Sequence, residues 1–138
     1  MNLQRWDLAA LKAGAMVALV FAVPFSIAAR WAADSRHDTT LATWMSIGAV
    51  IGFTLGAGCA AWVQQRDLPL SHGLATAIGT YVLAQSAFII IKLLRSNDVK
   101  WFASLFNLSV VAGAGLVGGL LGARLRARGF RPSGMEQR

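Results

Sequence analysis

Charged side chains are scarce in this chain and are missing from the middle of its apolar stretches. Only 14% of the 138 residues are charged, whereas a typical soluble domain has about 25%. Residues 39–65 contain no Asp, Glu, Lys or Arg at all. Transporters that couple to protons or cations usually need such a side chain inside the membrane, so its absence argues against coupled transport.

Cysteine and histidine are too few for most kinds of catalytic or metal site. Cys59 is the single cysteine, which excludes an intrachain disulfide and a thiolate metal site. The two histidines, His37 and His72, are predicted on opposite sides of a membrane, where they cannot share a metal ion. The sequence also has no serine, histidine and acid that could meet, no paired carboxylates and no phosphate-binding loop. We therefore expect no enzymatic activity, no cofactor and no metal.

The chain is rich in hydrophobic residues, which make up 56% of it and gather in four long runs. A run of roughly 20 residues is long enough to cross a bilayer as a helix. The sequence predicts an all-α polytopic membrane protein with four transmembrane helices arranged as two hairpins. A single domain would span residues 1–131, followed by a flexible basic tail at 132–138. The four spans are expected at roughly 9–31, 41–63, 71–94 and 101–123.

Individual residues near the ends of the runs support this prediction. Trp44 and Trp62 are 18 residues apart, or about 27 Å along a helix, as expected of two anchors at the membrane interfaces. Pro24 predicts a kink in the first span and not a break. Asp67 is expected to cap the third helix, with Pro69 in its first turn. Residues 96–98 have the composition of a turn.

The positions of lysine and arginine predict how the chain crosses the membrane. Four spans place both termini on one side, and eight of the 13 basic residues fall on that side. The positive-inside rule therefore favours a multi-pass protein of the cell (plasma or inner) membrane with cytoplasmic N- and C-termini. The eight are Arg5, Lys12, Arg66, Arg124, Arg126, Arg128, Arg131 and Arg138, and the other five are Arg30, Arg36, Lys92, Arg95 and Lys100.

Small residues recur at every fourth position in the second and fourth runs. On a helix this spacing forms a groove that lets another backbone approach closely in lipid. The sequence leaves three interpretations open: packing within one bundle, a self-association face, or a glycine-lined pore. The rows expected to pack are Gly48, Gly52, Gly56 and Ala60, and Gly115, Gly119 and Ala123, with Ala114, Gly118 and Gly122 one step around the last helix.

Polar side chains inside the spans gather in the half that faces away from the termini. Gln85 and Asn107 are predicted at nearly the same depth on antiparallel helices, and a direct hydrogen bond would satisfy both amides. The alternative is an outward-facing polar pocket. The residues that would line it are Ser26, Ser46, Gln85, Asn107 and Ser109.

The net charge of +7 points to the lipid bilayer and not to nucleic acid as the partner, because the bases lie at the ends of apolar runs. Arg124, Arg126 and Arg128 are expected either to hold anionic lipid headgroups or only to set the topology. His72 stands where the third span begins, as a polar interface residue or beside a headgroup phosphate.

Short motifs at 10–14, 52–66, 71–75 and 113–124 are spread over nearly the whole chain. Together they resemble a family of small four-helix bacterial integral membrane proteins of unknown function, best known from Gram-positive bacteria. That family typically has a His-Gly pair opening its third helix, as His72-Gly73 would here. The resemblance implies four spans and a cell-membrane location, and it supplies no catalytic residues. This chain departs from the family in having more tryptophan and a longer arginine tail.

Two functional hypotheses follow from the sequence. The first is a non-enzymatic multi-pass membrane protein that acts through glycine-mediated helix packing. It would be a self-assembling unit, as a homo-oligomer, or an accessory subunit of a larger membrane complex. The second is a small channel or uncoupled carrier for a small solute, which would use the outward-facing polar pocket.

Overall fold

Four long helices account for most of the chain. The structure, a computed structural model, describes residues 6–95, 99 and 101–130. The helices are α1 (Leu8–Ser35), α2 (Thr39–Val63), α3 (Pro69–Leu94) and α4 (Trp101–Ala127). Each is long and apolar enough to cross a membrane. The predicted all-α, four-helix, multi-pass fold is therefore confirmed.

Short polar side chains fix where the first two helices begin. The Asp7 carboxylate accepts a hydrogen bond from the Ala10 N–H at 3.1 Å, and the Asp38 carboxylate accepts one from the Leu41 N–H at 2.9 Å. Both satisfy backbone donors that a helix start otherwise leaves unpaired. Pro69 opens α3, as predicted, because its missing N–H is not needed there.

The predicted cap of α3 by Asp67 is wrong. Leu68 is the residue before α3, and no side chain caps this helix. Asp67 lies in the turn with a φ of 55° and pairs with an arginine of α4 instead. Elsewhere, α1 continues through Pro24 without ending, which agrees with the prediction that this proline does not break the helix.

Several predictions lie outside the described residues. They concern the turn at 96–98, the basic residues Arg5, Lys100, Arg131 and Arg138, and the tail at 132–138.

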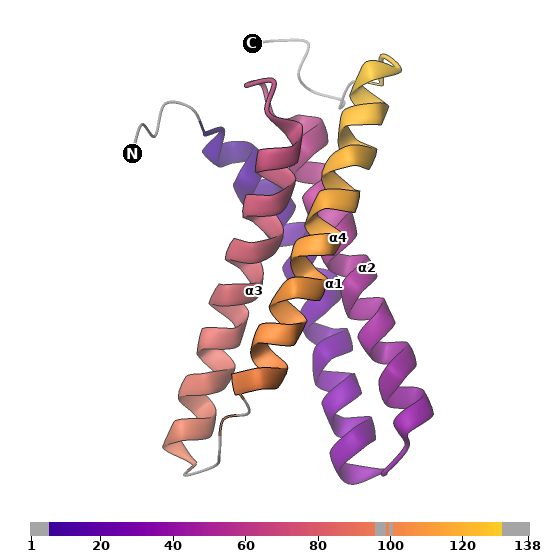
Figure 1. Ribbon diagram of the computed structural model, residues 1–138, viewed down its shortest axis with the longest axis vertical. Helices are drawn as coiled ribbons and strands as arrows, with labels where there is room; N and C mark the ends of the chain where they lie inside the picture. The colour runs from indigo at the N-terminus through magenta and orange to yellow at the C-terminus, as the bar shows by residue number, and fades with distance from the viewer. Residues whose placement is uncertain (1–5, 96–98, 100, 131–138) are drawn as a thin grey trace.

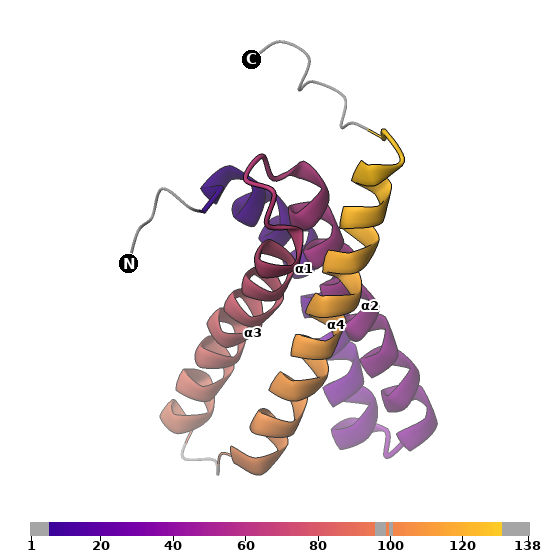
Figure 2. The same ribbon diagram turned by 45° about the horizontal axis from the view of Figure 1, so that its top comes forward.

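The helices form two hairpins that converge at one end and diverge at the other (Figures 1 and 2). The converging end, here called the terminal end, holds the start of α1, the end of α4 and the α2–α3 turn. The diverging end, here called the loop end, holds the α1–α2 and α3–α4 connections. Within the described residues, α2 packs against all three other helices, while α1 and α4 lie diagonally opposite without contact.

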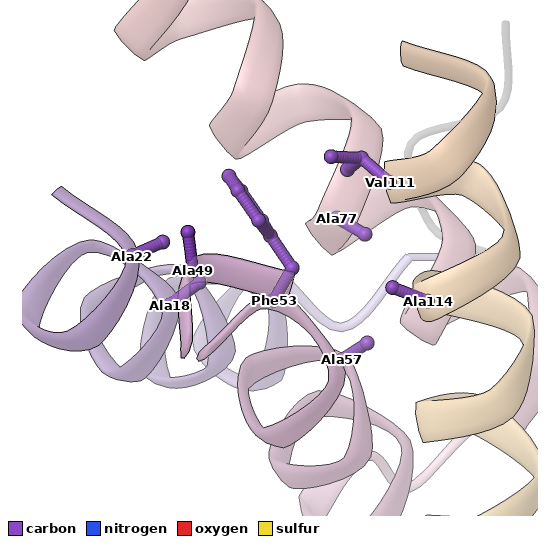
Figure 3. Packing of buried hydrophobic residues seen from close by; sticks show 8 residues of the cluster. All are labelled: Ala18, Ala22, Ala49, Phe53, Ala57, Ala77, Val111 and Ala114. Atoms are coloured by element: carbon purple, nitrogen blue, oxygen red, sulfur yellow. The ribbon is translucent and has the colours of Figure 1, made fainter. Parts of the chain in front are cut away.

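The core between the helices consists mainly of small side chains, with Phe53 as its one large member (Figure 3). Alanines bring helix axes close together, whereas a phenylalanine holds them apart. Phe53 packs edge-on against Tyr81 of α3, with ring centroids 6.2 Å apart. The remaining core residues are Ala18, Ala22, Ala49, Ala57, Ala77, Val111 and Ala114.

Candidate functional site

The glycine row of α2 packs along α1. A Cβ atom added at Gly56 would lie 2.6 Å from the Ala18 Cβ, and one at Gly52 would lie 2.9 Å from the Ala22 backbone nitrogen. A Cβ at Gly48 would lie 2.7 Å from the Phe25 ring. Ala60, the last member of the row, is fully buried. These contacts hold α1 and α2 together along most of their length.

The two small rows of α4 pack against two different helices. Added Cβ atoms at Gly115 and Gly119 would lie 3.2 Å from the backbone of α3, at Leu74 and Leu70. Gly118 and Gly122 lie equally close to α2, where an added Cβ would meet the Ala57 and Ala61 methyl groups at 2.8 Å. Ala123, predicted in the same row, is half-buried.

The glycine rows thus lie against helices of the same chain. Self-assembly or docking to a larger partner stays a prediction, and it would need surfaces other than these rows. The packing has another consequence, because Gly58 and Gly118 let α2 and α4 meet closely near the terminal end. Toward the loop end, larger side chains take over and the hairpins separate.

A cavity of about 210 Å³ lies between the two hairpins, from the middle of the bundle toward the loop end. All four helices contribute to its wall. Four of the five residues predicted for a polar pocket line it: Ser26, Ser46, Gln85 and Asn107. The fifth, Ser109, is exposed elsewhere and donates to the Leu105 carbonyl of its own helix.

The two amides on the wall do not form the direct hydrogen bond that the sequence predicted. Instead, Gln85 Nε2 donates to the Ser104 hydroxyl at 2.9 Å. The Tyr81 hydroxyl donates to the Ser104 carbonyl at 2.8 Å, so both α3 side chains bind the same residue of α4. These bonds hold α3 and α4 together at the cavity and leave the Asn107 amide for the cavity itself.

Thr80 contributes a buried hydroxyl without a partner. The residue is 4% exposed and lines the cavity, and its Oγ1 has no hydrogen bond in the structure. The Thr54 hydroxyl donates to the Val50 carbonyl four residues earlier at 3.0 Å, whereas the buried Thr76 hydroxyl, one turn before Thr80 on α3, also has no hydrogen bond. Thr80 lacks this usual bond, and its Oγ1 is enclosed, with almost no surface open to the cavity that the residue lines.

Arg30 stands at the outer part of the cavity. Its guanidinium lies over the Phe88 ring, 4.7 Å from the centroid. A second hollow of about 220 Å³ shares Arg30, Gln85, Phe88 and Asn107 with the cavity and continues past Lys92 toward the loop end. The two hollows therefore lie side by side and share part of their walls.

A separate cluster at the terminal end ties the start of α1 to the α2–α3 turn. The buried His72 ring accepts a hydrogen bond from the Asp7 N–H at Nε2, at 2.9 Å, and its Nδ1 lies 2.9 Å from the Leu68 carbonyl. The Trp6 ring packs on His72, with centroids 5.2 Å apart. The Asp7 carboxylate also accepts from the Gln65 N–H at 3.1 Å. His72 therefore links α3 to the start of α1 inside the bundle.

The arginines at the end of α4 differ in their surroundings. Arg126 donates to the Gln64 carbonyl at 2.7 Å and pairs with Asp67 at 3.0 Å, so it fastens α4 to the α2–α3 turn. Arg124 and Arg128 are exposed. Of the three arginines predicted to hold lipid headgroups, these two have exposed side chains that a headgroup can reach.

Comparison with protein-family models, with curated proteins and with solved structures finds no match to this chain. The resemblance drawn from the sequence motifs stays a prediction, and the geometry of the cavity carries the functional argument.

Three cavity residues were not recognised in the sequence as functional. Arg30 was counted as a charge that ends the first span, and Thr80 and Tyr81 were not singled out. A usable signal was present, since Arg30 follows Ser26 by four residues and Gln85 follows Tyr81 by four. Residues at this spacing share one face of a helix.

Proposed function

We propose that the protein is a solute-binding membrane protein whose site is the cavity between its two hairpins. The observation that carries the proposal is the cavity itself, which all four helices line and whose wall includes Thr80, a buried residue with an unpartnered hydroxyl. A buried hydroxyl without a hydrogen bond costs about 1–3 kcal/mol. Rotation of the Thr80 side chain toward the cavity would let a bound solute or water supply the missing partner. The Gln85 and Asn107 amides add further polar groups around it.

The shape of the site favours binding of a solute from one side of the bundle and argues against an open pore. The cavity and its neighbouring hollow reach from the loop end to mid-bundle. Beyond it, toward the terminal end, a Cβ at Gly58 would lie 3.3 Å from the Gly118 carbonyl oxygen, and the neighbouring alanines of α2 are fully buried. A solute crossing the membrane would need these contacts to open, so the site fits an uncoupled carrier better than a channel.

A ligand screen on the purified full chain in mild detergent tests the proposal. Thermal unfolding is followed with a panel of small neutral, anionic and cationic solutes. A ligand that binds only the folded state raises the melting temperature, and above its Kd the rise grows with the logarithm of its concentration. We expect a concentration-dependent rise with some solutes, which is lost in Ala84→Phe because a phenylalanine fills the cavity that Ala84 lines.

Ala87→Phe is the matched control, since Ala87 lies on the exposed face of α3 and not on the cavity wall. It should respond to solutes like the unmodified protein. The proposal is wrong if no solute raises the melting temperature with its concentration, or if the rise is the same in Ala84→Phe.

A further inference from the structure

We propose that the solute bound in this cavity is a small organic carboxylate, with its carboxylate on Arg30 and its apolar body extending toward Thr80. The inference rests on the proposed function and adds the chemical class of the ligand. It follows from the charge, the donor geometry and the size of the cavity.

The charge on the wall has one sign. Arg30 is the single charged residue among those that line the cavity, and no carboxylate lines it. The ion pair between Arg126 and Asp67 is the one found in the described part of the chain, so Arg30 has no acid within 4.0 Å. The neighbouring hollow adds Lys92 and Asp34, which leaves an excess of one positive charge over the two hollows.

Arg30 is held in a position that suits a carboxylate. A guanidinium presents five N–H donors in its plane and no acceptor. Its guanidinium carbon lies over the Phe88 ring, 4.7 Å from the centroid, and no acid among the described residues lies within ion-pair distance of it, so its N–H groups remain for a ligand. Planar donors of this kind bind carboxylates with two parallel hydrogen bonds, and a partly apolar surrounding strengthens the attraction.

The inner part of the cavity suits an apolar body with one polar end. Val50, Phe53 and Val111 line it beside the Thr80 hydroxyl. Thr80 and Phe88 are eight residues apart on α3, which corresponds to about 12 Å along the helix. A volume of about 210 Å³ equals that of roughly seven liquid waters at about 30 Å³ each. A ligand of one ring with a short acidic arm and a hydroxyl matches both dimensions.

Three probes with the same body and different charge test the inference: para-hydroxyphenylacetate, its neutral amide, and the cation tyramine. Binding to the full chain in detergent is measured by isothermal titration calorimetry and thermal shift. We expect the acid to bind about tenfold more tightly than the amide, because one charge-assisted contact is worth that much. Tyramine should bind more weakly still.

Variants of two arginines test whether the preference for the acid depends on Arg30. Arg30→Gln should bring the acid down to the affinity of the amide, while Arg30→Lys, which keeps the charge, should retain part of the preference. Arg36→Gln is the matched control, because Arg36 also stacks on an aromatic ring, Trp31 at 5.3 Å, but does not line the cavity. It should bind all three probes like the unmodified protein.

The outcomes separate the ligand class from the proposed function. If the amide or tyramine binds as tightly as the acid, and Ala84→Phe abolishes that binding, the carboxylate inference is overturned and the solute-binding function stands. A preference for the acid that survives in Arg30→Gln also overturns it. Dodecanoate is added as a lipid-like probe with a long chain. If it binds more tightly than the hydroxy acid, a small solute is excluded as the ligand. Failure of all probes to bind overturns the inference, and the labelling of Thr80→Cys described below then decides separately whether the cavity exists.

Discussion

Thr80 and Thr54 are the same residue type in two different situations. The Thr54 hydroxyl donates to the Val50 carbonyl of its own helix, which is how threonines in apolar helices usually satisfy themselves. The Thr80 hydroxyl is buried without any hydrogen bond. An unpaired buried hydroxyl weakens the folded state, and the Thr76 hydroxyl shares this situation. Of the two threonines, Thr80 is the one that lines the cavity, where a ligand or water can reach it once its side chain rotates.

Replacing Thr80 with valine should therefore separate stability from binding. Thr80→Val keeps the shape and removes the unpaired hydroxyl, so the ligand-free protein should be as stable as before or more stable by about 1 kcal/mol. Solute binding should weaken. Stability is measured by unfolding in mixed micelles with increasing SDS, and binding by thermal shift. Thr54→Val is the control and should gain no stability, because it loses a hydrogen bond. A marked loss of stability in Thr80→Val would show that its hydroxyl has a structural partner.

At the scale of the helices, glycine decides which pairs meet closely. Gly118 faces α2, where an added Cβ would lie 2.8 Å from the Ala57 Cβ and 2.9 Å from the Gly58 nitrogen. Backbone atoms of a packed helix cannot give way as a flexible side chain can. Gly113, on the same helix, has no heavy atom within 4 Å of an added Cβ. The two glycines therefore differ in role although they lie in one glycine-rich segment.

The substitution of alanine at these two positions gives a paired prediction. Gly118→Ala should reduce the free energy of unfolding by about 1–3 kcal/mol, because α2 and α4 must move apart. Gly113→Ala should leave it unchanged or raise it by up to about 1 kcal/mol through helix propensity. SDS titration of the full chain measures both. Equal effects at the two positions would contradict the close packing of α2 and α4.

Helix ends show what charge patterns predict and what they miss. The first and fourth predicted spans end at 31 and 123, beside Arg30 and Arg124, yet α1 runs on to Ser35 and α4 to Ala127. A charged residue ends the part of a helix in the hydrocarbon and not the helix itself, because arginine side chains reach outward to the interface. The caps by Asp7 and Asp38 then decide where α1 and α2 begin. Asp67 looked like a cap of the same kind, but its pairing with Arg126 depends on contacts between distant parts of the chain.

At the scale of the whole molecule, hydrogen bonds link the helices at the terminal end, whereas the two hairpins lie apart at the loop end. Asp7 joins α1 to His72 and to the α2–α3 turn, and Arg126 joins α4 to the same turn. Small residues close the space between the hairpins there. Toward the loop end Phe53 and larger side chains hold the hairpins apart, which creates the cavity.

The sequence predicted part of this site for a physical reason. Ser26, Ser46, Gln85 and Asn107 are polar residues at similar depth in apolar helices, so they were expected near one another. Depth alone does not fix the direction in which a side chain points, and Ser109 therefore faces away from the cavity. The role of Arg30 depends on its stacking over Phe88, which joins two helices that are far apart in the sequence.

The most direct test of the account is whether water reaches Thr80. In a Cys59→Ser background, Thr80→Cys and Leu83→Cys are labelled in open membrane fragments with a small charged methanethiosulfonate reagent. Leu83 lies on α3 within one turn of Thr80 but is 67% exposed on the outer, lipid-facing side of the bundle. Such reagents react with thiolates, which form in water and not in lipid. The account predicts fast labelling of Thr80→Cys, blocked by Ala84→Phe, and little labelling of Leu83→Cys. An unreactive Thr80→Cys would show that the space between the hairpins is closed and dry, and would contradict the account.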